Sequence, residues 1–208
     1  MLQRLVHDAA ALGVALTEHD AARLRQLLEE LAHWNRQFNL TGITDLESMV
    51  SHHVLDSLAI HRYLHGAAIA DAGTGAGFPG LPLALVNPER RFTLIDSNGK
   101  KIRFVSHAVR TLGLMNVEPL QTRVETLRPE RPFDTVVARA FAPLPELLET
   151  VAPLCGSATH VLAMKGKWPQ QELDALPQRW RVAESHTLTV PGLAEDRCLI
   201  VLISGVAH

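Results

Sequence analysis

Residues 71–80 read Asp-Ala-Gly-Thr-Gly-Ala-Gly-Phe-Pro-Gly and follow directly on a short apolar run. Glycines at this density let the backbone turn tightly and approach a ligand without interference from a Cβ atom. The proline favours the first turn of a helix. The segment is therefore predicted to connect a buried strand to a helix and to hold a nucleotide-like cofactor. A glycine-rich turn without any ligand is the alternative interpretation.

Two cofactor classes compete for this loop. The spacing Gly75-x-Gly77-x-x-Gly80 satisfies the dinucleotide fingerprint, in which a helix N-terminus holds a pyrophosphate. The wider pattern Asp71-x-Gly73-x-Gly75-x-Gly77 resembles the first motif of Rossmann-type methyltransferases, which bind S-adenosylmethionine. That cofactor lacks a pyrophosphate but carries a methionyl ammonium, which a carboxylate can attract. An NAD-dependent oxidoreductase is the competing hypothesis, although the chain offers no second domain for hydride chemistry.

The length of 208 residues suits one catalytic domain with a small extension. We expect a helical cap over residues 1–60 and the catalytic domain over residues 61–208. No apolar stretch approaches the ~20 residues that span a bilayer, and the N-terminus does not resemble a secretion signal, so a cytoplasmic protein without a membrane partner is predicted. Cys155 and Cys198 have no paired spacing and are expected to be core residues in a reducing compartment.

Charge is distributed unevenly around a net value of −2. Residues 1–60 carry 4 Arg and 8 Asp/Glu, a net of −4, whereas residues 90–139 carry 10 Lys/Arg and 5 Asp/Glu, a net of +5. An acidic total can therefore hide a basic face that contacts the phosphates of a nucleic acid. The alternative is a solvated helix face beside an anionic cofactor pocket.

Apolar spacing predicts a helix over residues 17–38, capped by Thr17 and Asp20, and a second helix towards Leu58 that begins at a capping box formed by Thr44 and Glu47. From residue 67 the pattern changes to short apolar runs separated by helix-like segments, which favours a parallel sheet with crossover helices. These runs cover residues 69–72, 92–95, 117–120, 135–138 and 161–164. Two final β-rich runs, 182–190 and 198–204, are predicted to form an antiparallel pair that completes the sheet.

Candidate ligand-binding residues follow the predicted strands, because an open α/β sheet binds its ligand beyond the carboxyl ends of the strands. Asp96 can accept hydrogen bonds from both ribose hydroxyls, or cap the next helix. Val124 and Glu125 are within reach of an adenine. Arg139 suits the methionyl carboxylate or a phosphate of the methyl acceptor.

In their order and spacing, these residues resemble the bacterial small-subunit ribosomal RNA guanine-N7 methyltransferases (RsmG, also called GidB) over nearly the whole chain. The matching fragments are Asn39-Leu40-Thr41, His53-x-x-Asp56-Ser57-Leu58, Asp71 to Gly80 with Leu81-Pro82-Leu83-Ala84, Asp96-Ser97, Lys100-Lys101 with Phe104, Arg123-Val124-Glu125, Arg139-Ala140 and Lys165-Gly166. One departure is Ala138, where the family commonly has a serine.

The resemblance implies a Rossmann-like class I S-adenosylmethionine-dependent methyltransferase. Its fold would be α/β, with a mostly parallel seven-stranded sheet, C-terminal antiparallel strands and an N-terminal helical extension. The implied substrate is N7 of a guanine in 16S rRNA, nucleotide 527 in standard rRNA numbering, near the decoding centre. The resemblance and the motifs together predict these cofactor-binding residues: Asp71, Gly73, Gly75, Gly77, Phe78, Asp96, Ser97, Val124, Glu125 and Arg139. Asn39, His53 and Asp56 either line the acceptor side or lock the cap onto the sheet, and the second role is favoured.

Guanine N7 carries a lone pair and no proton, so its methylation requires alignment rather than a general base, and no catalytic residue is assigned. Candidates for RNA contact are Lys100, Lys101, Arg123 and Lys165. An RNA loop in 16S rRNA or in the small subunit is the expected partner, since an A-form helix hides the N7 edge; no DNA partner, no metal and a monomer are expected. Trp34, Trp168 and Trp180 are interpreted as core or hinge residues. A non-enzymatic ribosome-assembly factor is a further alternative.

Overall fold

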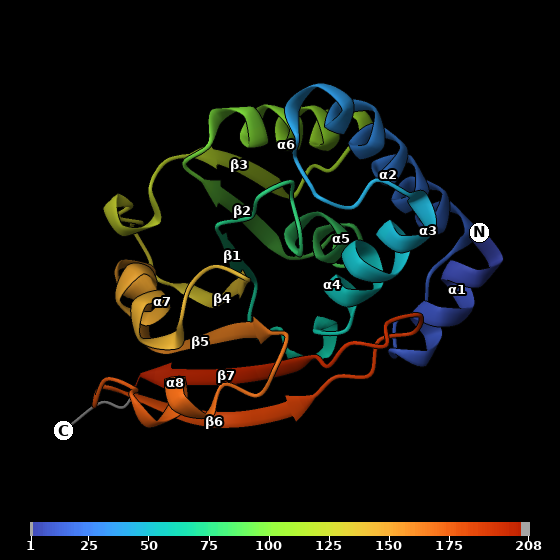
Figure 1. Cartoon of the computed structure of the whole chain (residues 1–208). Helices are drawn as coiled ribbons and strands as arrows, with labels where there is room; N and C mark the ends of the chain where they lie inside the picture. Colours follow the sequence, from blue (N-terminus) through green and yellow to red (C-terminus); the bar gives the residue numbers. More distant parts are fainter. Residues whose placement is uncertain (1, 205–208) are drawn as a thin grey trace.

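A computed structural model of the chain, which describes residues 2–204, contains one seven-stranded sheet in the order β3-β2-β1-β4-β5-β7-β6 (Figure 1). The strands are β1 Ala68–Ala72, β2 Arg91–Asp96, β3 Val117–Gln121, β4 Phe133–Arg139, β5 Cys155–Lys165, β6 Trp180–Thr187 and β7 Cys198–Ser204. Neighbours from β3 to β5 pair in parallel, whereas β7 is antiparallel to both β5 and β6. The predicted mixed sheet with its C-terminal antiparallel pair is confirmed.

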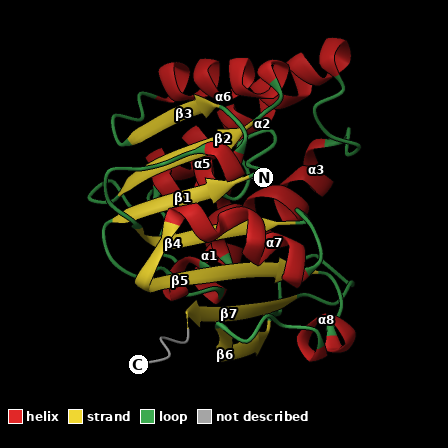
Figure 2. Cartoon of the chain, turned by 90° about the vertical axis from the view of Figure 1, so that its left-hand side faces the viewer, coloured by secondary structure: helices red, strands yellow, loops and turns green. Residues whose placement is uncertain are grey.

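Helices cover both faces of this sheet (Figure 2). They are α1 Leu2–Ala11, α2 Glu18–Phe38, α3 Leu46–Met49, α4 Asp56–Leu58, α5 Gly80–Leu85, α6 Gly99–Leu112, α7 Leu144–Val151 and α8 Gln170–Asp174. A π-helical stretch, Val50–Leu55, joins α3 to α4, and short 3₁₀ turns cover His61–Tyr63, Val124–Thr126 and Ala152–Leu154. The long N-terminal helix, the glycine loop between β1 and α5, and the crossover helix α6 lie where the sequence predicted them.

The caps of the N-terminal helices confirm one prediction and correct another. Thr17 and Asp20 form the predicted capping box of α2, with each side chain accepting the other's backbone N–H. Helix α3 is capped by Asp45 and not by Thr44: the Asp45 carboxylate accepts a hydrogen bond from the Ser48 backbone N–H at 2.8 Å. The box predicted from Thr44 is therefore wrong by one residue, because a carboxylate three positions before a free N–H caps it directly.

Strand residues alternate between two hydrophobic clusters, as side chains of successive strand residues point to opposite faces. One cluster joins β1 and β2 to α2, α5 and α6, and it includes Ile69, Leu94 and the fully buried Phe104. The other packs α7 against Ala70 and Ile95. Helices from the first 60 residues thus share a core with the sheet, and their description as a separate domain stays a prediction.

Candidate functional site

The loop that follows β1 has glycine at positions where φ is positive, a backbone conformation that other residues rarely adopt. Gly73, Gly75 and Gly77 have φ values of +69°, +61° and +87°. A Cβ atom on Gly73 would collide with the Phe141 ring, reaching 2.7 Å from Cε2, and one on Gly77 would collide with Leu81. The loop therefore needs glycine both for its conformation and for its close contacts.

Asp71 lies beneath this loop and holds it in shape. Its side chain is fully buried, and Oδ2 accepts hydrogen bonds from Thr74 Oγ1 at 2.7 Å and from the Gly80 backbone N–H at 2.8 Å. Burial raises its pKa to about 6. Oδ1 has no hydrogen-bond partner among residues 2–204. Asp71 lines neither cavity described below, so the visible role of its carboxylate is to tie the two ends of the loop together, and its predicted contact with a methionyl ammonium stays a prediction.

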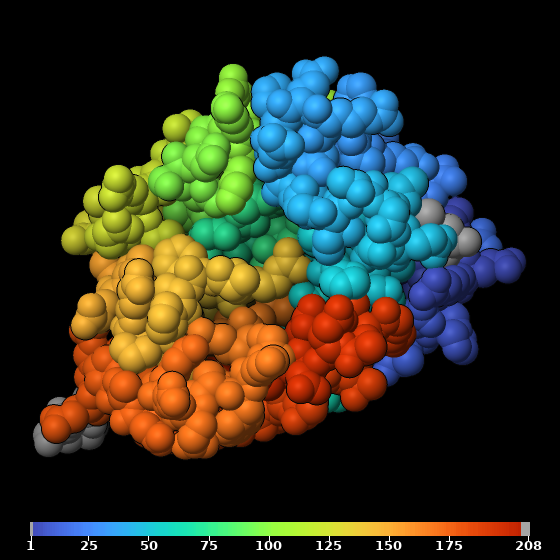
Figure 3. All heavy atoms as spheres, in the orientation of Figure 1, coloured from blue at the N-terminus to red at the C-terminus, as the bar shows by residue number. Residues whose placement is uncertain are grey.

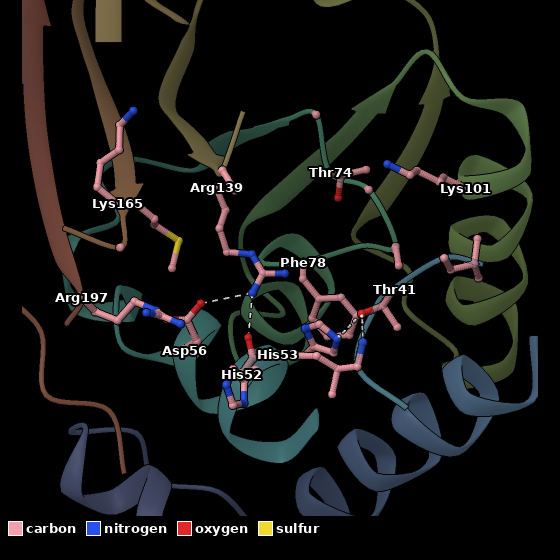
Figure 4. A pocket seen from close by; sticks show the side chains of 18 residues that line it. Thr41, His52, His53, Asp56, Thr74, Phe78, Lys101, Arg139, Lys165 and Arg197 are labelled. Atoms are coloured by element: carbon pink, nitrogen blue, oxygen red, sulfur yellow. Dashed lines mark hydrogen bonds and ion pairs between the residues drawn. The ribbon is translucent and has the colours of Figure 1, made fainter. Parts of the chain in front are cut away.

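Two adjoining cavities open at the carboxyl ends of the strands, in the hollow at the centre of the face shown in Figure 3. The first cavity has a volume of about 520 Å³ and lies between the glycine loop and the π-helical stretch (Figure 4). The second has a volume of about 420 Å³ and lies between the ends of β2 and β3. Gly73, Lys101 and Ala140 line both. The two cavities therefore form adjoining halves of one elongated groove.

The second cavity brings together Asp96, Ser97, Val124 and Glu125, four of the predicted cofactor contacts. The Asp96 carboxylate accepts hydrogen bonds from the backbone N–H groups of Gly75, at 3.0 Å, and Asn98, at 2.8 Å. A carboxylate has about four acceptor positions, so it keeps capacity for two hydroxyl groups.

The alternative interpretation of Asp96 as a helix cap is wrong. Helix α6 is capped by Asn98, whose side-chain oxygen accepts hydrogen bonds from the N–H groups of Lys100 and Lys101. Asp96 precedes that helix by too many residues for its carboxylate to reach the same donors, and it is left to hold the glycine loop instead.

A cluster of three charged side chains forms one wall of the first cavity (Figure 4). The buried carboxylate of Asp56 lies 3.1 Å from Arg139 Nη1 and 3.1 Å from Arg197 Nε. Arg139 Nη1 also donates to the carbonyl of His52 at 2.9 Å. Two guanidinium groups against one carboxylate leave a net charge of +1, which suits an anionic ligand group. The ion pairs also connect the N-terminal helices to β4 and β7, so Asp56 both lines the cavity and locks the cap.

Phe78 and His53 pack against each other at the bottom of the first cavity, with ring centroids 4.8 Å apart. His53 Nε2 lies 2.9 Å from Thr41 Oγ1, and burial lowers the pKa of His53 to about 4. The imidazole is therefore neutral at physiological pH. Asn39 has a different role: it ends α2 with φ at +50°, its N–H bonded to the Asn35 carbonyl.

The four predicted RNA contacts occupy different environments. Lys101 lines both cavities, while Lys100 is exposed and lines neither. Arg123 is exposed at the rim of the second cavity. Lys165 lies at the first cavity, but its ammonium is held by Glu172 at 2.7 Å and by a backbone carbonyl. Lys101 and Arg123 also have acidic neighbours, Asp96 at 4.0 Å and Glu125 at 3.6 Å, but these ion pairs are longer than the 2.7 Å pair of Lys165. Lys101 and Arg123 are thus better placed to meet a ligand than Lys100 or Lys165.

Sequence reasoning missed two residues of the site and misjudged a residue near it. Phe141 lies against Gly73 and lines the second cavity. Arg197 belongs to a stretch without a motif, yet it immediately precedes β7; because β7 is antiparallel to β5, its start lies at the edge where β5 ends, and this topology was the available signal. Trp168, interpreted as a core or hinge residue, is 50% exposed, so the core interpretation is wrong.

Comparison with known proteins identifies the family. The profile of the family described as rRNA small subunit methyltransferase G matches residues 20–200. The chain belongs to this family. It is 48% identical to a Ribosomal RNA small subunit methyltransferase G of Pseudomonas aeruginosa, over 95% of this chain and 93% of the relative. It is 43% identical to the protein of that name from Aeromonas salmonicida, over 96% of each.

Solved structures with a similar fold include methyltransferases, in agreement with membership of the rRNA small subunit methyltransferase G family. An S-adenosylmethionine-dependent methyltransferase of Aquifex aeolicus aligns with a TM-score of 0.57 and 19% identity, over 75% of this chain and 93% of the other. The prediction of a Rossmann-like methyltransferase fold is confirmed, as is membership of the family. Within residues 2–204, no helix is long and apolar enough to cross a membrane, and no three His, Cys, Asp or Glu side chains cluster as metal ligands.

The groove has features that fit S-adenosylmethionine. Gly73 lines both halves of the groove, and a Cβ atom there would collide with the Phe141 ring that lines the second, so this position excludes a side chain. The carboxylate of Asp96 at one end suits ribose hydroxyls, and the positive cluster of Arg139, Asp56 and Arg197 at the other suits a carboxylate. The residues present are therefore chemically matched to the two ends of this molecule.

Proposed function

We propose that this protein methylates N7 of a guanine in 16S rRNA, at nucleotide 527 near the decoding centre, with S-adenosylmethionine as the methyl donor. One observation carries the proposal: a groove in two halves, with the acid Asp96 in one and a positively charged cluster in the other, lies in a chain that belongs to a small-subunit rRNA methyltransferase family. The first cavity then receives the acceptor base beside the methionyl end.

Eight of the ten predicted cofactor contacts line the two cavities, and the other two, Asp71 and Gly77, line neither. We assign the adenosine end to Asp96, Ser97, Val124 and Glu125, which line the second cavity. The methionyl end is assigned to the main chain of the glycine loop and to the surplus positive charge beside Arg139. Phe78 supports the first cavity from below. When bound, this cofactor supplies an activated methyl group on a sulfonium.

The residues of the first cavity suit a reaction that needs no proton transfer at the nucleophile. Guanine N7 has a lone pair and no hydrogen, so the protein has to align and desolvate it. His53 is neutral, with a pKa held near 4 by burial and its Nε2 engaged by Thr41. Lys101 lines both cavities, and a Lys or Arg directed at O6 identifies guanine while leaving N7 free. Positioning is therefore the main catalytic contribution of these side chains.

The cellular setting follows from the substrate. The relatives named above are bacterial, and bacteria make and assemble small-subunit rRNA in the cytoplasm. The proposal therefore places the protein there, acting as a monomer on RNA that exposes the N7 edge in a loop.

The test is methyl transfer to unmethylated small-subunit rRNA and particles, followed by mapping of the modified nucleotide. Label at guanine N7 of nucleotide 527 is expected, and label only on protein, on another base or on small molecules would refute the proposal. A thermal-shift measurement separates the cofactor classes, since S-adenosylhomocysteine should raise the melting temperature and NAD should not.

Asp96→Ala provides the matched test of the cofactor site. The variant should weaken S-adenosylhomocysteine binding by about tenfold or more, because a hydrogen bond to a charged group contributes about 1.5–3 kcal/mol. Glu130→Ala, at an exposed acid away from both cavities, is the control and should bind like the wild type. Equal affinity of the two variants would contradict the assignment of the second cavity.

A further inference from the structure

A third cavity, with a volume of about 570 Å³, lies beside the first on the segment that joins β5 to α8. Lys165 and Gly166 line both cavities, so the two are contiguous. The remaining wall includes Lys167, Trp168 and Gln170. Anything that enters the first cavity as part of a longer chain therefore has this neighbouring surface within reach.

Trp168 presents an exposed aromatic ring on an anchored loop. Half of its surface is accessible, whereas the neighbouring Pro169 is buried and the carbonyl of Lys167 accepts a hydrogen bond from the Cys198 thiol at 3.4 Å. The indole Nε1 donates to Gln170 Oε1 at 3.1 Å, which fixes the ring. The ring is thus held in place and accessible to a partner, with half of its surface in water.

The charge around this ring favours an anionic partner. Lys167 is exposed and has no ion pair among residues 2–204, whereas the acid in the same wall, Glu172, is neutralised by Lys165 at 2.7 Å. An aromatic face next to a free cation is the combination that binds single-stranded nucleic acid, since bases stack on the ring and phosphates meet the ammonium.

We propose that Trp168 stacks on a base of the substrate RNA that flanks the methylated nucleotide, while Lys167 contacts a phosphate of the same strand. The proposal rests on the function proposed above. It adds a second point of RNA contact in the third cavity, next to the cavity that receives the reacting base. It deepens that function by assigning part of the RNA path to the segment between β5 and α8.

The test compares Trp168→Ala, Trp168→Phe and Lys167→Ala with the wild type in direct binding to unmethylated 16S rRNA and in methyl transfer. Trp168→Ala should weaken RNA binding and raise KM by about five- to tenfold, the low end of the range for loss of one stacked base, while kcat and S-adenosylhomocysteine affinity stay unchanged. Trp168→Phe should retain most of the affinity. The logarithm of the RNA association constant falls with the logarithm of the salt concentration, and Lys167→Ala should make this slope shallower by about 0.7. Trp168→Ala should leave the slope unchanged.

Met115→Ala is the matched control, because Met115 is 97% exposed but lies at the opposite edge of the sheet, before β3, and should bind RNA normally. RNA affinity of Trp168→Ala equal to that of the Met115 control would overturn the proposal. So would a loss seen with intact subunits but not with protein-free rRNA, since the ring would then contact a ribosomal protein. Binding needs no turnover, so a wild type that fails to methylate rRNA refutes the proposed function separately.

Discussion

Replacement of Gly73 by alanine tests whether the two halves of the groove hold one ligand. The new Cβ would sit at a φ of +69°, a conformation that costs an L-residue about 1–2 kcal/mol. It would also displace the Phe141 ring, and overpacking of this kind costs about 1–3 kcal/mol. The folded state should therefore lose about 2–5 kcal/mol.

The same substitution should impair cofactor binding. Phe141 lines the second cavity and lies against Gly73, which lines both, so the Cβ either drives the ring into the groove or enters it itself. We expect S-adenosylhomocysteine to bind Gly73→Ala at least about tenfold more weakly, equivalent to ~1.4 kcal/mol. Isothermal titration calorimetry measures the affinity, and denaturant unfolding measures the stability.

Gly113→Ala is the control for backbone strain alone. Gly113 ends α6 with φ at +62°, and a Cβ there would meet nothing within 4 Å. This variant should lose only about 1–2 kcal/mol of stability and bind the cofactor normally. If folded Gly73→Ala binds S-adenosylhomocysteine as tightly as Gly113→Ala does, the reasoning that joins the two cavities into one cofactor groove is refuted.

Two further predictions concern stability. Asp56→Ala should destabilise the fold by about 3 kcal/mol in chemical denaturation, since it leaves two partly buried guanidinium groups unpaired. Glu47→Ala, which breaks an exposed 2.8 Å ion pair, should cost at most about 1 kcal/mol, and similar losses in the two variants would contradict this account. The second prediction concerns pH: burial lowers the pKa of His53 from 6.5 to about 4, so the unfolded chain binds a proton between these values and the folded chain does not. Relative to His53→Gln, the wild type should therefore gain about 3 kcal/mol as pH rises from about 4 to 6.5, and parallel unfolding curves across that window would disprove it. The comparison with the variant is needed because the pKa of Asp71 is raised to about 6 in the folded state. Ionisation of Asp71 therefore lowers the stability of the fold as pH rises over much of the same range.

Local sequence determined the parts of this protein that depend on a few neighbouring residues. The capping box of Thr17 and Asp20, the strand-loop-helix of residues 71–80 and the alternation of strands with helices all follow from backbone conformation and short-range hydrogen bonds. The family resemblance reached further, because ordered motifs carry the fold and the cofactor class along the whole chain. These features could be predicted without knowing which distant segments meet.

Tertiary structure alone decided how the side chains share the site. Asp56 pairs with arginines 83 and 141 residues away, and no local pattern indicates that both would reach one buried carboxylate. The same limit applies to Asp71, whose buried place beneath the loop no motif indicates, and to Trp168, interpreted as a core or hinge residue but 50% exposed. Burial and ion pairing depend on surfaces supplied by remote strands and helices, and these surfaces exist only once the sheet has assembled.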